Sequence, residues 1–491
     1  MTLVTQFKNK NILVLGLGLT GLSCVRYLAS QGLTFAVNDS RATAVEQQQF
    51  NTDFPQVNLS LGGWDSKKIS VADIIIVSPG IDLNNNDITP YINEHCQVLG
   101  DVELFFQVLN ADNVQIPTLA ITGSNGKSTV VTLLAHIGEQ LGLTVCLAGN
   151  IGTPIMDLLI DNKYLSCDAL ILELSSFQLE TLSSMQANGA SILNISDDHL
   201  DRHKTLQNYQ KIKQSIYQQA QTLVINRDDV LTQPCNSTEQ QHVISFGSDA
   251  PQKAQFGLAI EQNELQLMFA DQALIAVNKL PISGIHNALN CLAALALGQT
   301  IGWSLAAMVK ALPSFIGLAH RCQVVASDDG IIWINDSKAT NVGSTLAALE
   351  GLAKTKQTDQ QLILIAGGEG KGADFSPLAP VINKEVALLI TLGKDADKLA
   401  CLTPSSVKTT SLIAAVKLAN QQAKQGDIVL LSPACASLDM FKNFAERGNV
   451  FIEAVQNLAV HKEIANKKIV SKKANNSKSA LAQNERGQLN D

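Results

Sequence analysis

The sequence predicts a three-domain α/β protein: a Rossmann-like N-terminal domain, a central domain resembling a P-loop ATPase with a mostly parallel sheet, and a Rossmann-like C-terminal domain. Three observations predict this class. The chain has 491 residues, enough for about three domains of about 150 residues each. Its 46% apolar and 16% charged residues are typical of a chain that buries a large core. Short apolar runs alternate with helical stretches, as in parallel sheets covered by helices.

The first glycine loop marks the N-terminal domain, expected over residues 1–112. Residues Gly16–Gly21 read G-L-G-L-T-G between an expected strand and helix, and Asp39 ends the next strand. Glycines here let the backbone approach a diphosphate at the helix N-terminus. NAD(P) and UDP-sugars both carry a diphosphate, so both ligands stay open. The expected elements are strands at Asn11–Leu15, Thr34–Asn38 and Asp73–Val77 and a helix at Gly21–Ser30.

A second glycine loop marks the central domain, expected over residues 113–316. Residues Thr122–Thr129 read T-G-S-N-G-K-S-T, a shorter variant of the Walker pattern because Ile121 stands where that pattern has its first glycine. Backbone N–H groups of such a loop cradle phosphates, its lysine reaches the β- and γ-phosphates, and a hydroxyl ligates Mg²⁺. The loop therefore predicts an ATP site. The flanking elements are expected at Thr118–Thr122 (strand) and Val130–Leu141 (helix).

Two metal-ligating side chains are expected beside this loop. Glu173 ends the expected strand Ala169–Leu174, and His199 follows the expected strand Ser191–Ile195. The carboxyl ends of parallel strands meet at one edge of a sheet. A carboxylate at that edge is suited to Mg²⁺, so both residues are predicted to lie near the phosphate loop.

The C-terminal domain is expected over residues 317–458, after the hinge region at Leu312-Pro313. Its strands are expected at Gln361–Ala366, Val386–Leu392 and Asp427–Leu431. Residues 459–491 are expected to form a basic, disordered tail, because seven Lys or Arg and three acidic residues follow His461.

Charge and composition exclude several function classes. The net charge of −8 argues against general attraction to nucleic acid or anionic lipid. Nine cysteines without a C-x-x-C pair indicate reduced thiols rather than a disulfide framework or zinc site. The uncharged stretch Asn287–Val309 is interrupted by amides and glycines, so two buried helices are expected rather than a membrane span. Residues 1–10 lack the order of a secretory signal, and we expect a cytoplasmic protein.

Six motifs together resemble the Mur ligase family. They are T-G-S-N-G-K-S-T, E-L-S-S-F-Q-L-E from Glu173, N-I-S-D-D-H-L-D-R-H from Asn194, G-I-H-N-A-L-N from Gly284, H-R at His320, and N-D-S-K-A-T-N from Asn335. They occur in the family's order, and the resemblance runs from about Asn11 to Val455.

Three segments resemble the D-glutamate-adding members: Asn335–Asn341, Gly367–Phe375 and Ser432–Ser437. The D-N-P-R element of the diaminopimelate-adding relatives is absent. Glu369 stands where aspartate is expected, and its role stays open.

The resemblance implies an ATP-dependent ligase of peptidoglycan precursor synthesis. Such an enzyme phosphorylates the terminal carboxylate of UDP-N-acetylmuramoyl-L-alanine, and the amine of D-glutamate attacks the acyl phosphate, giving an amide, ADP and phosphate. ATP and two Mg²⁺ ions are the implied cofactors, and a monomer that binds only small molecules is expected.

The resemblance also implies the site residues. Catalytic roles fall to Lys127, Glu173, His199 and Lys213. ATP binding falls to Gly123, Ser124, Asn125, Gly126, Lys127, Ser128, Thr129, Asn287, Asn290, Arg321 and Asp336. The residues implied to bind the UDP-substrate are Gly18, Leu19, Thr20, Asp39, Ser40, Arg41, Ser78, Gly80, Asn150 and Ser175. The residues implied to bind D-glutamate are Lys338, Thr340, Lys371, Ser437 and Phe444. The metal ligands are Ser128, Glu173, His199 and Lys213.

Lys213 is expected to ligate Mg²⁺ as a carbamate, since it matches the lysine that this family carbamylates. It lies 12 residues after Asp201. Lys211 is close enough to leave the register open, and an ordinary surface lysine is the alternative interpretation.

Three other functions stay open at this point. An NAD(P)-dependent oxidoreductase would explain the first glycine loop but not Lys127, Glu173 and His199. A nucleotide-binding switch or scaffold would leave the third-domain residues without a purpose. Another amino-acid-adding ligase of the same family would differ only in the C-terminal site.

Overall fold

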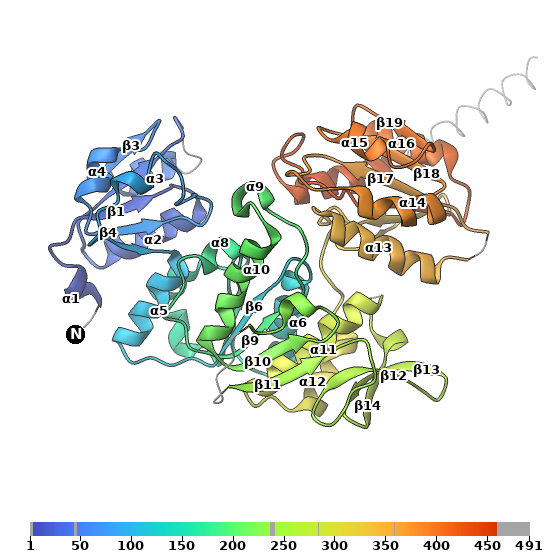
Figure 1. The fold of residues 1–491 in the computed structure, drawn as a ribbon, viewed down its shortest axis with the longest axis horizontal. Coiled ribbons are helices and arrows are strands. Elements are labelled where there is room, and N and C mark those ends of the chain that lie inside the picture. The colour runs from blue at the N-terminus through green and yellow to red at the C-terminus, as the bar shows by residue number, and fades with distance from the viewer. Residues whose placement is uncertain (1–2, 44–46, 236–240, 283, 358, 459–491) are drawn as a thin grey trace, which may run out of the picture. The chain divides into compact units, whose positions relative to one another are not determined.

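The computed structural model describes residues 3–43, 47–235, 241–282, 284–357 and 359–458. The chain forms two compact units that meet in sequence at Gly317 and Leu318. The first unit holds two sheets and the second holds one (Figure 1). The basic tail predicted at 459–491 lies outside the described residues.

The N-terminal sheet has five parallel strands in the order β3-β2-β1-β4-β5. Its central strands β1 and β4 read I-L-V-L and I-I-I-V and are buried throughout, because helices cover both faces of a parallel sheet. The strands are β1 Ile12–Leu15, β2 Phe35–Asp39, β3 Asn58–Leu61, β4 Ile74–Val77 and β5 Gln97–Leu99. The helices are α1 Leu3–Phe7, α2 Leu19–Ser30, α3 Gln47–Asp53, α4 Ser66–Val71, η1 Thr89–Tyr91 and α5 Asp101–Ala111.

The central sheet has nine strands in the order β14-β13-β12-β11-β10-β9-β6-β8-β7, and only β12, β13 and β14 pair antiparallel. The predicted, mostly parallel sheet is therefore confirmed, with an antiparallel edge. Its strands are β6 Thr118–Thr122, β7 Val145–Gly149, β8 Ala169–Glu173, β9 Ala187–Ile192, β10 Ala220–Asn226, β11 His242–Phe246, β12 Phe256–Glu261, β13 Glu264–Phe269 and β14 Gln272–Ala276.

Helices on both faces cover this central sheet. They are α6 Lys127–Gln140, α7 Ile155–Ile160, η2 Lys163–Ser166, α8 Ser176–Leu179, α9 Leu200–His203, α10 Leu206–Gln214, η3 Ser215–Gln219, η4 Val230–Thr232, η5 Val277–Lys279, α11 Ile285–Thr300, α12 Leu305–Ala311 and η6 Leu312–Ser314. The uncharged stretch forms α11 and α12, as predicted. Over the described ranges, none of the helices has the length and hydropathy to cross a membrane.

Two predicted boundaries beside the phosphate loop are wrong, and the loop explains both. The predicted strand Ser191–Ile195 also begins earlier than expected, at Ala187. Strand β9 ends at Ile192 rather than Ile195, because Asn194 turns to the loop: its carbonyl accepts from Ser124 N–H at 2.8 Å and its Oδ1 from Asn125 N–H at 2.8 Å. Helix α6 begins at Lys127 rather than Val130, directly after Gly126, which holds a left-handed φ of +84°.

The second unit holds a six-stranded sheet in the order β15-β16-β20-β17-β18-β19. Only the edge pair β15–β16 is antiparallel. The strands are β15 Gln323–Val325, β16 Ile332–Asn335, β17 Leu362–Gly367, β18 Leu388–Leu392, β19 Ser406–Lys408 and β20 Ile428–Leu431. The helices are α13 Val342–Thr355, η7 Ser376–Leu378, α14 Ala379–Glu385, α15 Ala396–Ala400, α16 Leu412–Gln422 and a last helix over 444–458.

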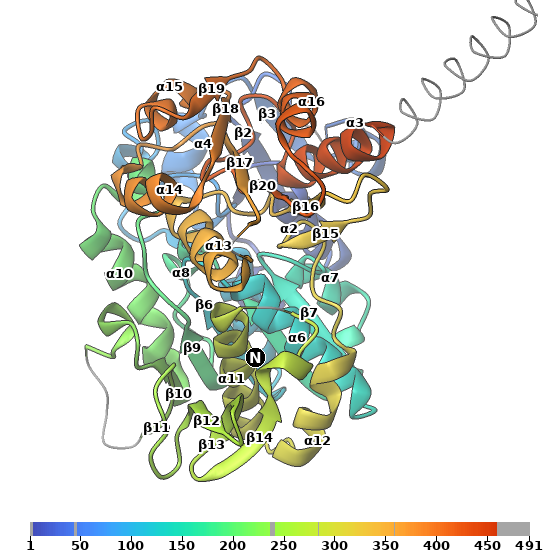
Figure 2. The same ribbon diagram turned by 90° about the vertical axis from the view of Figure 1, so that its right-hand side faces the viewer.

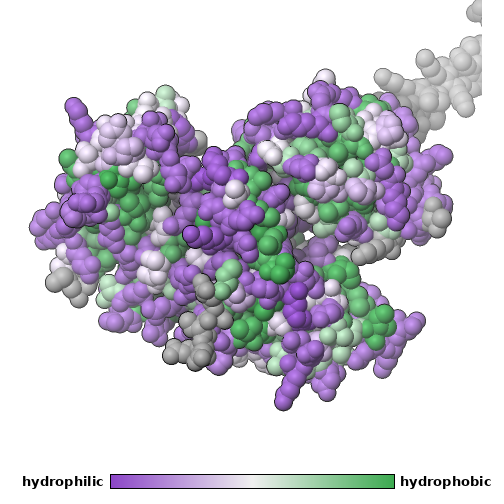
Figure 3. Space-filling view, viewed as in Figure 1, coloured by the Kyte–Doolittle hydropathy of each residue, from purple (hydrophilic) through white to green (hydrophobic). Residues whose placement is uncertain are grey.

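Alternating side chains of β17 divide the core of the second unit between two layers. Leu362 and Leu364 pack with α13 and α14, whereas Ile363 and Ile365 pack with α16 and the last helix. Figure 2 shows this sheet with helices on both faces. Hydrophilic residues cover much of the visible surface of each unit (Figure 3). All nine cysteines are free thiols.

Candidate active site

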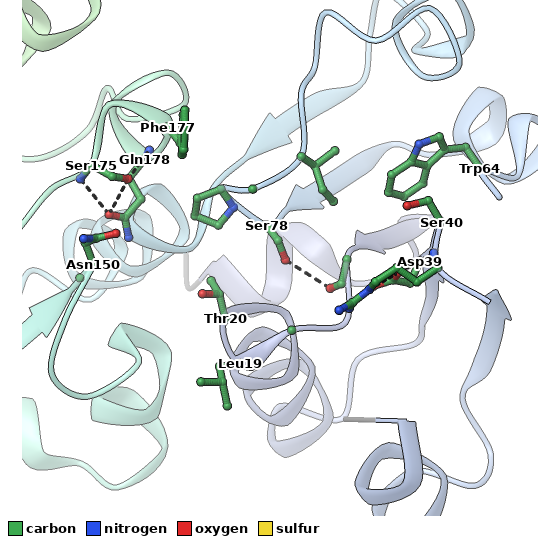
Figure 4. Close-up of a pocket in the computed structure, with 17 residues that line it drawn as sticks. Leu19, Thr20, Asp39, Ser40, Trp64, Ser78, Asn150, Ser175, Phe177 and Gln178 are labelled. Atoms are coloured by element: carbon green, nitrogen blue, oxygen red, sulfur yellow. Dashed lines mark hydrogen bonds and ion pairs between the residues drawn. The ribbon is translucent and has the colours of Figure 1, made fainter. Parts of the chain in front are cut away.

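A cavity of about 540 Å³ lies in the first unit, where the first glycine loop faces the ends of β7 and β8 (Figure 4). We call it the glycine-loop pocket. Its lining includes all ten residues predicted for the UDP-substrate: Gly18, Leu19, Thr20, Asp39, Ser40, Arg41, Ser78, Gly80, Asn150 and Ser175. Residues far apart in sequence thus share one pocket.

The glycine loop is held from below by Asp39 and Ser78. Asp39 Oδ2 accepts from Leu17 N–H at 2.7 Å, and both its oxygens accept from the Arg41 guanidinium, at 2.7 and 2.9 Å. Burial opposes ionisation, but these hydrogen bonds prevail and lower the pKa of Asp39 to about 2. Ser78 Oγ donates to Gly16 O at 3.2 Å. A Cβ at Gly16, whose φ is +91°, would lie 2.8 Å from Ser78 Oγ, so this position requires glycine.

The opposite wall of the pocket is a helix N-terminus. Ser175 caps α8, and its Oγ accepts from Gln178 N–H while Gln178 Oε1 accepts from Ser175 N–H, both at 3.2 Å. This reciprocal pair is a capping box. Gln178 Nε2 donates to Asp101 Oδ2 at 3.4 Å. The box fixes Ser175 toward the cavity.

Several lining residues were missed from the sequence. Trp64, Ile81, Phe177 and Gln178 line the pocket but were not predicted as site residues, although Phe177 and Gln178 lie in the motif that begins at Glu173. Only Gln178 had a readable signal, the S-x-x-Q spacing of a capping box after Ser175. Trp64 comes from a loop that only the tertiary fold brings to the cavity.

The phosphate loop, Gly123–Thr129, is ordered around Lys127. Lys127 Nζ donates to Gly123 O at 2.6 Å and to Ser124 O at 2.8 Å. Ser124 Oγ donates to Ser196 O at 3.0 Å. Ser128 and Thr129 lie buried in the first turn of α6. The loop N–H groups and the helix N-terminus suit a polyphosphate.

Two asparagines of α11 are next to the loop. A Cβ at Gly126 would lie 2.6 Å from Asn290 Oδ1, and Asn290 Nδ2 donates to Asn287 Oδ1 at 3.2 Å. The predicted nucleotide residues of the central domain are therefore together. His286 precedes this pair in the first turn of α11, and burial lowers its pKa.

Lys213 is buried directly beneath the phosphate loop, with a relative exposure of 1%. Its Nζ donates to Thr122 Oγ1 and Gly123 O, both at 3.0 Å, and lies 4.6 Å from the Tyr209 ring centroid. Burial first, and then the charge of Lys127, hold the pKa of Lys213 well below its usual range. Lys211 is exposed, so the structure favours Lys213 in the register that the sequence left open.

Glu173 ends β8 beside the loop and is 1% exposed. Its Oε1 accepts from Asn150 Nδ2 at 2.7 Å. Its Oε2 is buried and has no hydrogen-bond partner among the residues that the structure describes. An unpaired buried carboxylate oxygen is costly, and a cation is the partner that would remove the cost.

His199 lies at the start of α9 with a left-handed φ of +54°. Its side chain is one-third exposed, and its ring packs edge-on against Phe177 at 4.9 Å. His203, one turn on, is buried and bonds Ser176 Oγ at 2.9 Å. Burial first, and then nearby cations, lower the pKa of His203 to about 4. His203 is therefore a neutral structural ring, and His199 is the accessible one.

The residues at this sheet edge fit a magnesium ion. Glu173 offers an unpaired oxygen, Ser128 a hydroxyl in the first turn of α6, and Lys213 an amine suited to carbamylation. Within the described ranges, no three His, Cys, Asp or Glu side chains form a metal cluster by themselves. When Mg²⁺ binds a nucleotide, it takes few protein ligands and completes its shell with phosphate and water.

In the second unit, Asp336 follows β16 and is buried. Its Oδ2 accepts from Ser432 Oγ at 2.8 Å and its Oδ1 from Cys322 N–H at 3.2 Å. Burial raises its pKa to about 6, although those bonds and the charge of Arg321 oppose the rise. The structure therefore brings Asp336 and Arg321 near each other.

Of the residues predicted for D-glutamate, Lys338, Thr340, Lys371 and Ser437 lie on loops at the carboxyl ends of β16, β17 and β20, and Phe444 begins the last helix. Lys338 Nζ lies 4.0 Å from the centroid of the Phe444 ring. Thr340 N–H donates to Lys338 O at 2.8 Å. Lys371 holds a left-handed φ of +52°, and Ser437 is buried.

Arg447 joins these loops and was missed from the sequence. It is 2% exposed and donates to Ser337 O at 2.7 Å, Ser337 Oγ at 3.0 Å and Cys435 O at 3.1 Å. Burial lowers its pKa to about 10, so it remains charged near neutral pH. A lone arginine in a helix carries no sequence signal of this role.

A phosphate loop beside a diphosphate-type glycine pocket, followed by a further Rossmann-like sheet, defines a nucleotide-using α/β protein of several domains. Family models give the class more narrowly. Residues 10–100 match the Mur ligase MurD-like N-terminal domain, residues 121–298 the Mur ligase middle domain, and residues 320–435 the Mur ligase glutamate ligase domain. The chain belongs to the Mur ligase family.

Relatives agree with this membership. The chain is 56% identical to a UDP-N-acetylmuramoylalanine–D-glutamate ligase of Colwellia psychrerythraea, over 93% of this chain and 98% of that protein. It is 46% identical to the enzyme of the same name from Shewanella violacea, over 91% and 96%. Its fold is similar to that of UDP-N-acetylmuramate-alanine ligase from Thermotoga maritima (TM-score 0.57, 19% identity, 91% of this chain and 100% of that one).

Proposed function

We propose that this chain is an ATP-dependent ligase that adds D-glutamate to UDP-N-acetylmuramoyl-L-alanine in peptidoglycan precursor synthesis. One observation carries the proposal: Asn150 lines the glycine-loop pocket and also donates to Glu173 at 2.7 Å. One side chain thus connects the pocket to the phosphate-loop edge of the central sheet. A substrate held in the pocket by its UDP-sugar can present its terminal carboxylate to the γ-phosphate of ATP.

The three sheets would then divide the ligands. Residues 1–112, with Asn150 and Ser175, hold the UDP-substrate; residues 113–316, with Arg321 and Asp336, hold ATP; residues 317–458 hold D-glutamate. ATP and a UDP-linked precursor place the reaction in the cytoplasm, and we expect a monomer.

In the first step, a carboxylate oxygen of the alanine attacks the γ-phosphorus and ADP leaves. Both reactants are anions, so cations must lower their repulsion. Lys127 exchanges its bonds to Gly123 O and Ser124 O for the γ-phosphoryl oxygens, and the loop N–H groups hold the β-phosphate. Two Mg²⁺ ions, which Ser128, Glu173, His199 and the carbamate of Lys213 would hold between them, would supply further charge neutralisation when bound.

As a carbamate, Lys213 would ligate Mg²⁺. Its lowered pKa favours the neutral amine, which attacks CO₂: an N–C bond forms, a C=O π bond of CO₂ breaks, and the nitrogen loses a proton to water. The product is an anion beneath the phosphate loop, suited to a second Mg²⁺.

In the second step, the amine of D-glutamate attacks the acyl carbon and phosphate leaves with the oxygen that joined it to the carbonyl. Lys338, Thr340, Lys371, Ser437 and Phe444 bind the amino acid. Its two carboxylates require cations and N–H donors, which Lys338 and Lys371 with the loop backbone supply.

Phosphate release tests the proposal. Release with UDP-N-acetylmuramoyl-L-alanine, ATP and Mg²⁺ should require D-glutamate, and L-glutamate, L-alanine and L-lysine should not replace it. Lys127→Ala should abolish release. Release that is independent of D-glutamate, or a full rate in Lys127→Ala, would contradict the assignment.

A nicotinamide-dependent reaction has less support. Asp39, the residue that would hold a ribose in such an enzyme, already accepts from Leu17 N–H and Arg41. Absorbance at the nicotinamide band after mixing with NAD(P) checks this alternative directly.

A further inference from the structure

A short turn in the second unit connects the two loops that carry Lys371 and Ser437. The turn is Gly393–Asp395, between β18 and α15. None of its residues belongs to a motif considered so far. We infer that this turn positions both D-glutamate loops, with Asp395 as the principal positioning residue; the inference rests on the proposed function.

Asp395 bonds the Lys371 loop twice. Its N–H donates to Gly368 O at 2.9 Å, and its Oδ2 accepts from Gly370 N–H at 2.8 Å. Its Oδ1 pairs with Lys398 Nζ at 2.8 Å. Gly370 directly precedes Lys371, so the Asp395 carboxylate fixes the Glu369–Gly370 peptide, one residue before that lysine.

Lys394 reaches both loops. Its Nζ pairs with Glu369 Oε1 at 2.6 Å, and its N–H donates to Asp439 Oδ2 at 2.8 Å. Glu369 is the residue found where aspartate was expected, and its longer side chain makes this pair. Asp439 lies two residues after Ser437, so Lys394 connects the two loops.

The two loops also pair with each other through their backbones. Glu369 N–H donates to Ala436 O at 3.0 Å, and Ala436 N–H donates to Glu369 O at 2.8 Å. This bridge places Glu369, two residues before Lys371, opposite the neighbour of Ser437. A shift of either loop therefore moves the other.

Gly393 permits this close approach. Its φ is +80°, and a Cβ there would lie 2.7 Å from Asp439 Oδ2 and 2.8 Å from the Gly368 backbone. Only glycine satisfies both the left-handed conformation and the space. The turn, the Lys371 loop and the Ser437 loop are therefore packed backbone against backbone.

Three carboxylates, those of Glu369, Asp395 and Asp439, lie on or beside the two loops proposed to bind a dicarboxylic amino acid. Free carboxylates would repel the substrate. Here each carboxylate has a partner. Glu369 pairs with Lys394 Nζ, and Asp439 accepts from Lys394 N–H. Asp395 accepts from Gly370 N–H and pairs with Lys398. Their function is to hold loop backbone rather than to contact the amino acid.

The main test compares Asp395→Ala with Asp395→Asn and with Asp397→Ala in the full chain. Asp397 lies two residues further on, in α15, and its side chain pairs with Lys408 on the surface. Asp395→Ala should raise the KM for D-glutamate about tenfold, the effect of one lost charge-assisted hydrogen bond. Asp395→Asn keeps an acceptor for Gly370 N–H and should recover most of the loss. Asp397→Ala should match the wild type.

A second readout separates positioning from a general loss of structure. Hydroxylamine traps the acyl phosphate without D-glutamate, and its rate and the KM for ATP should be unchanged in Asp395→Ala. An unchanged KM for D-glutamate, or equal effects of Asp395→Ala and Asp397→Ala, would overturn the inference. Absence of D-glutamate-dependent release in the wild type would instead contradict the proposed function.

If Asp395→Ala does not fold, variants of the exposed Glu369–Lys394 pair test the role of the turn instead. Glu369→Gln and Lys394→Gln should each raise the KM for D-glutamate about two- to threefold, as expected for an exposed pair. The double exchange Glu369→Lys with Lys394→Glu should restore it. Single variants with wild-type KM values would contradict the role of the turn.

Discussion

Lys213 is the residue whose surroundings most restrict its chemistry. It is enclosed under the phosphate loop, donates to two oxygens and lies over Tyr209. Its lowered pKa favours the neutral amine, the form that reacts with CO₂. A surface lysine, the alternative considered from the sequence, would have neither property.

Replacing Lys213 therefore separates its role from that of its neighbour. Lys213→Ala should lower the rate of phosphate release by at least about 100-fold, because it removes the anionic ligand proposed to hold Mg²⁺ beside the reacting phosphate. Lys211→Ala, two residues earlier and exposed, should keep the wild-type rate. For the wild type, degassing at mildly acidic pH should reduce the rate and bicarbonate should restore it. Equal rates for Lys213→Ala and the wild type would contradict the carbamate.

Asp101 gives a pH-dependent prediction at the same scale. Burial raises its pKa to about 6, above the ordinary 3.8, and its Oδ1 has no hydrogen-bond partner. Because the folded-state pKa is the higher one, ionisation opposes folding; the cost is fully present above pH 6 and disappears below about pH 4. Asp101→Asn should therefore raise the free energy of unfolding by about 1–2 kcal/mol at pH 8 and much less at pH 4.

Urea unfolding at the two pH values measures this effect. Asp112→Asn, at the exposed C-terminal end of the same helix, is the matched control and should change stability little at either pH. A destabilised Asp101→Asn at pH 8 would show that the carboxylate contributes more through Gln178 than its burial costs.

At the scale of elements, the phosphate loop depends on glycine where β6 passes into α6. Gly126 has a φ of +84° and faces Asn290 Oδ1. Gly142, just after α6, has a similar φ of +77° but nothing within 4 Å of an added Cβ. Both glycines have a left-handed backbone conformation, but only at Gly126 would an added Cβ contact another side chain.

Alanine at these glycines should therefore give different results. Gly142→Ala should cost about 1 kcal/mol of stability from strain alone and leave the KM for ATP unchanged. Gly126→Ala should raise the KM for ATP at least about tenfold, because the Cβ displaces Asn290 or the loop. Calorimetric ATP binding and thermal unfolding measure the two effects; similar ATP affinities in both variants would contradict the packing of Asn290 on the loop.

Some helices, strands and site residues could be predicted from the sequence, and others could not. The βα rhythm and the two glycine loops predicted the parallel sheets, because apolar runs and turn glycines are local signals. The end of β9 was missed, because Asn194 bonds the phosphate loop, a contact between segments distant in sequence. Trp64 and Arg447 were missed for the same reason: their roles come from tertiary position, whereas Gly18, Lys127 and Glu173 belong to motifs. Phe177 lies in the motif that begins at Glu173, but the motif alone does not show that Phe177 lines the pocket.

For the whole molecule, an acidic chain of net charge −8 would have to bind a nucleoside triphosphate, a UDP-sugar and a dicarboxylic amino acid. Local devices make this possible: helix N-termini and loop N–H groups in the first unit, and Lys338, Lys371 and loop backbone in the second. Asp39, Asp395 and Asp439 use their charge on backbone N–H groups and on basic side chains, so they add little repulsion at the proposed sites.

In the proposed reaction, one chain transfers the γ-phosphoryl group of ATP to the carboxylate of the UDP-linked alanine and then exchanges it for D-glutamate. Transfer of an oxygen isotope from the carboxylate to phosphate tests this route. UDP-N-acetylmuramoyl-L-alanine labelled with ¹⁸O in both carboxylate oxygens is incubated with ATP, Mg²⁺ and D-glutamate, and the phosphate is analysed by mass spectrometry. For the acyl-phosphate route, we expect one ¹⁸O in each phosphate and one ¹⁸O retained in the new amide. Unlabelled phosphate released together with the amide product would contradict the acyl-phosphate route.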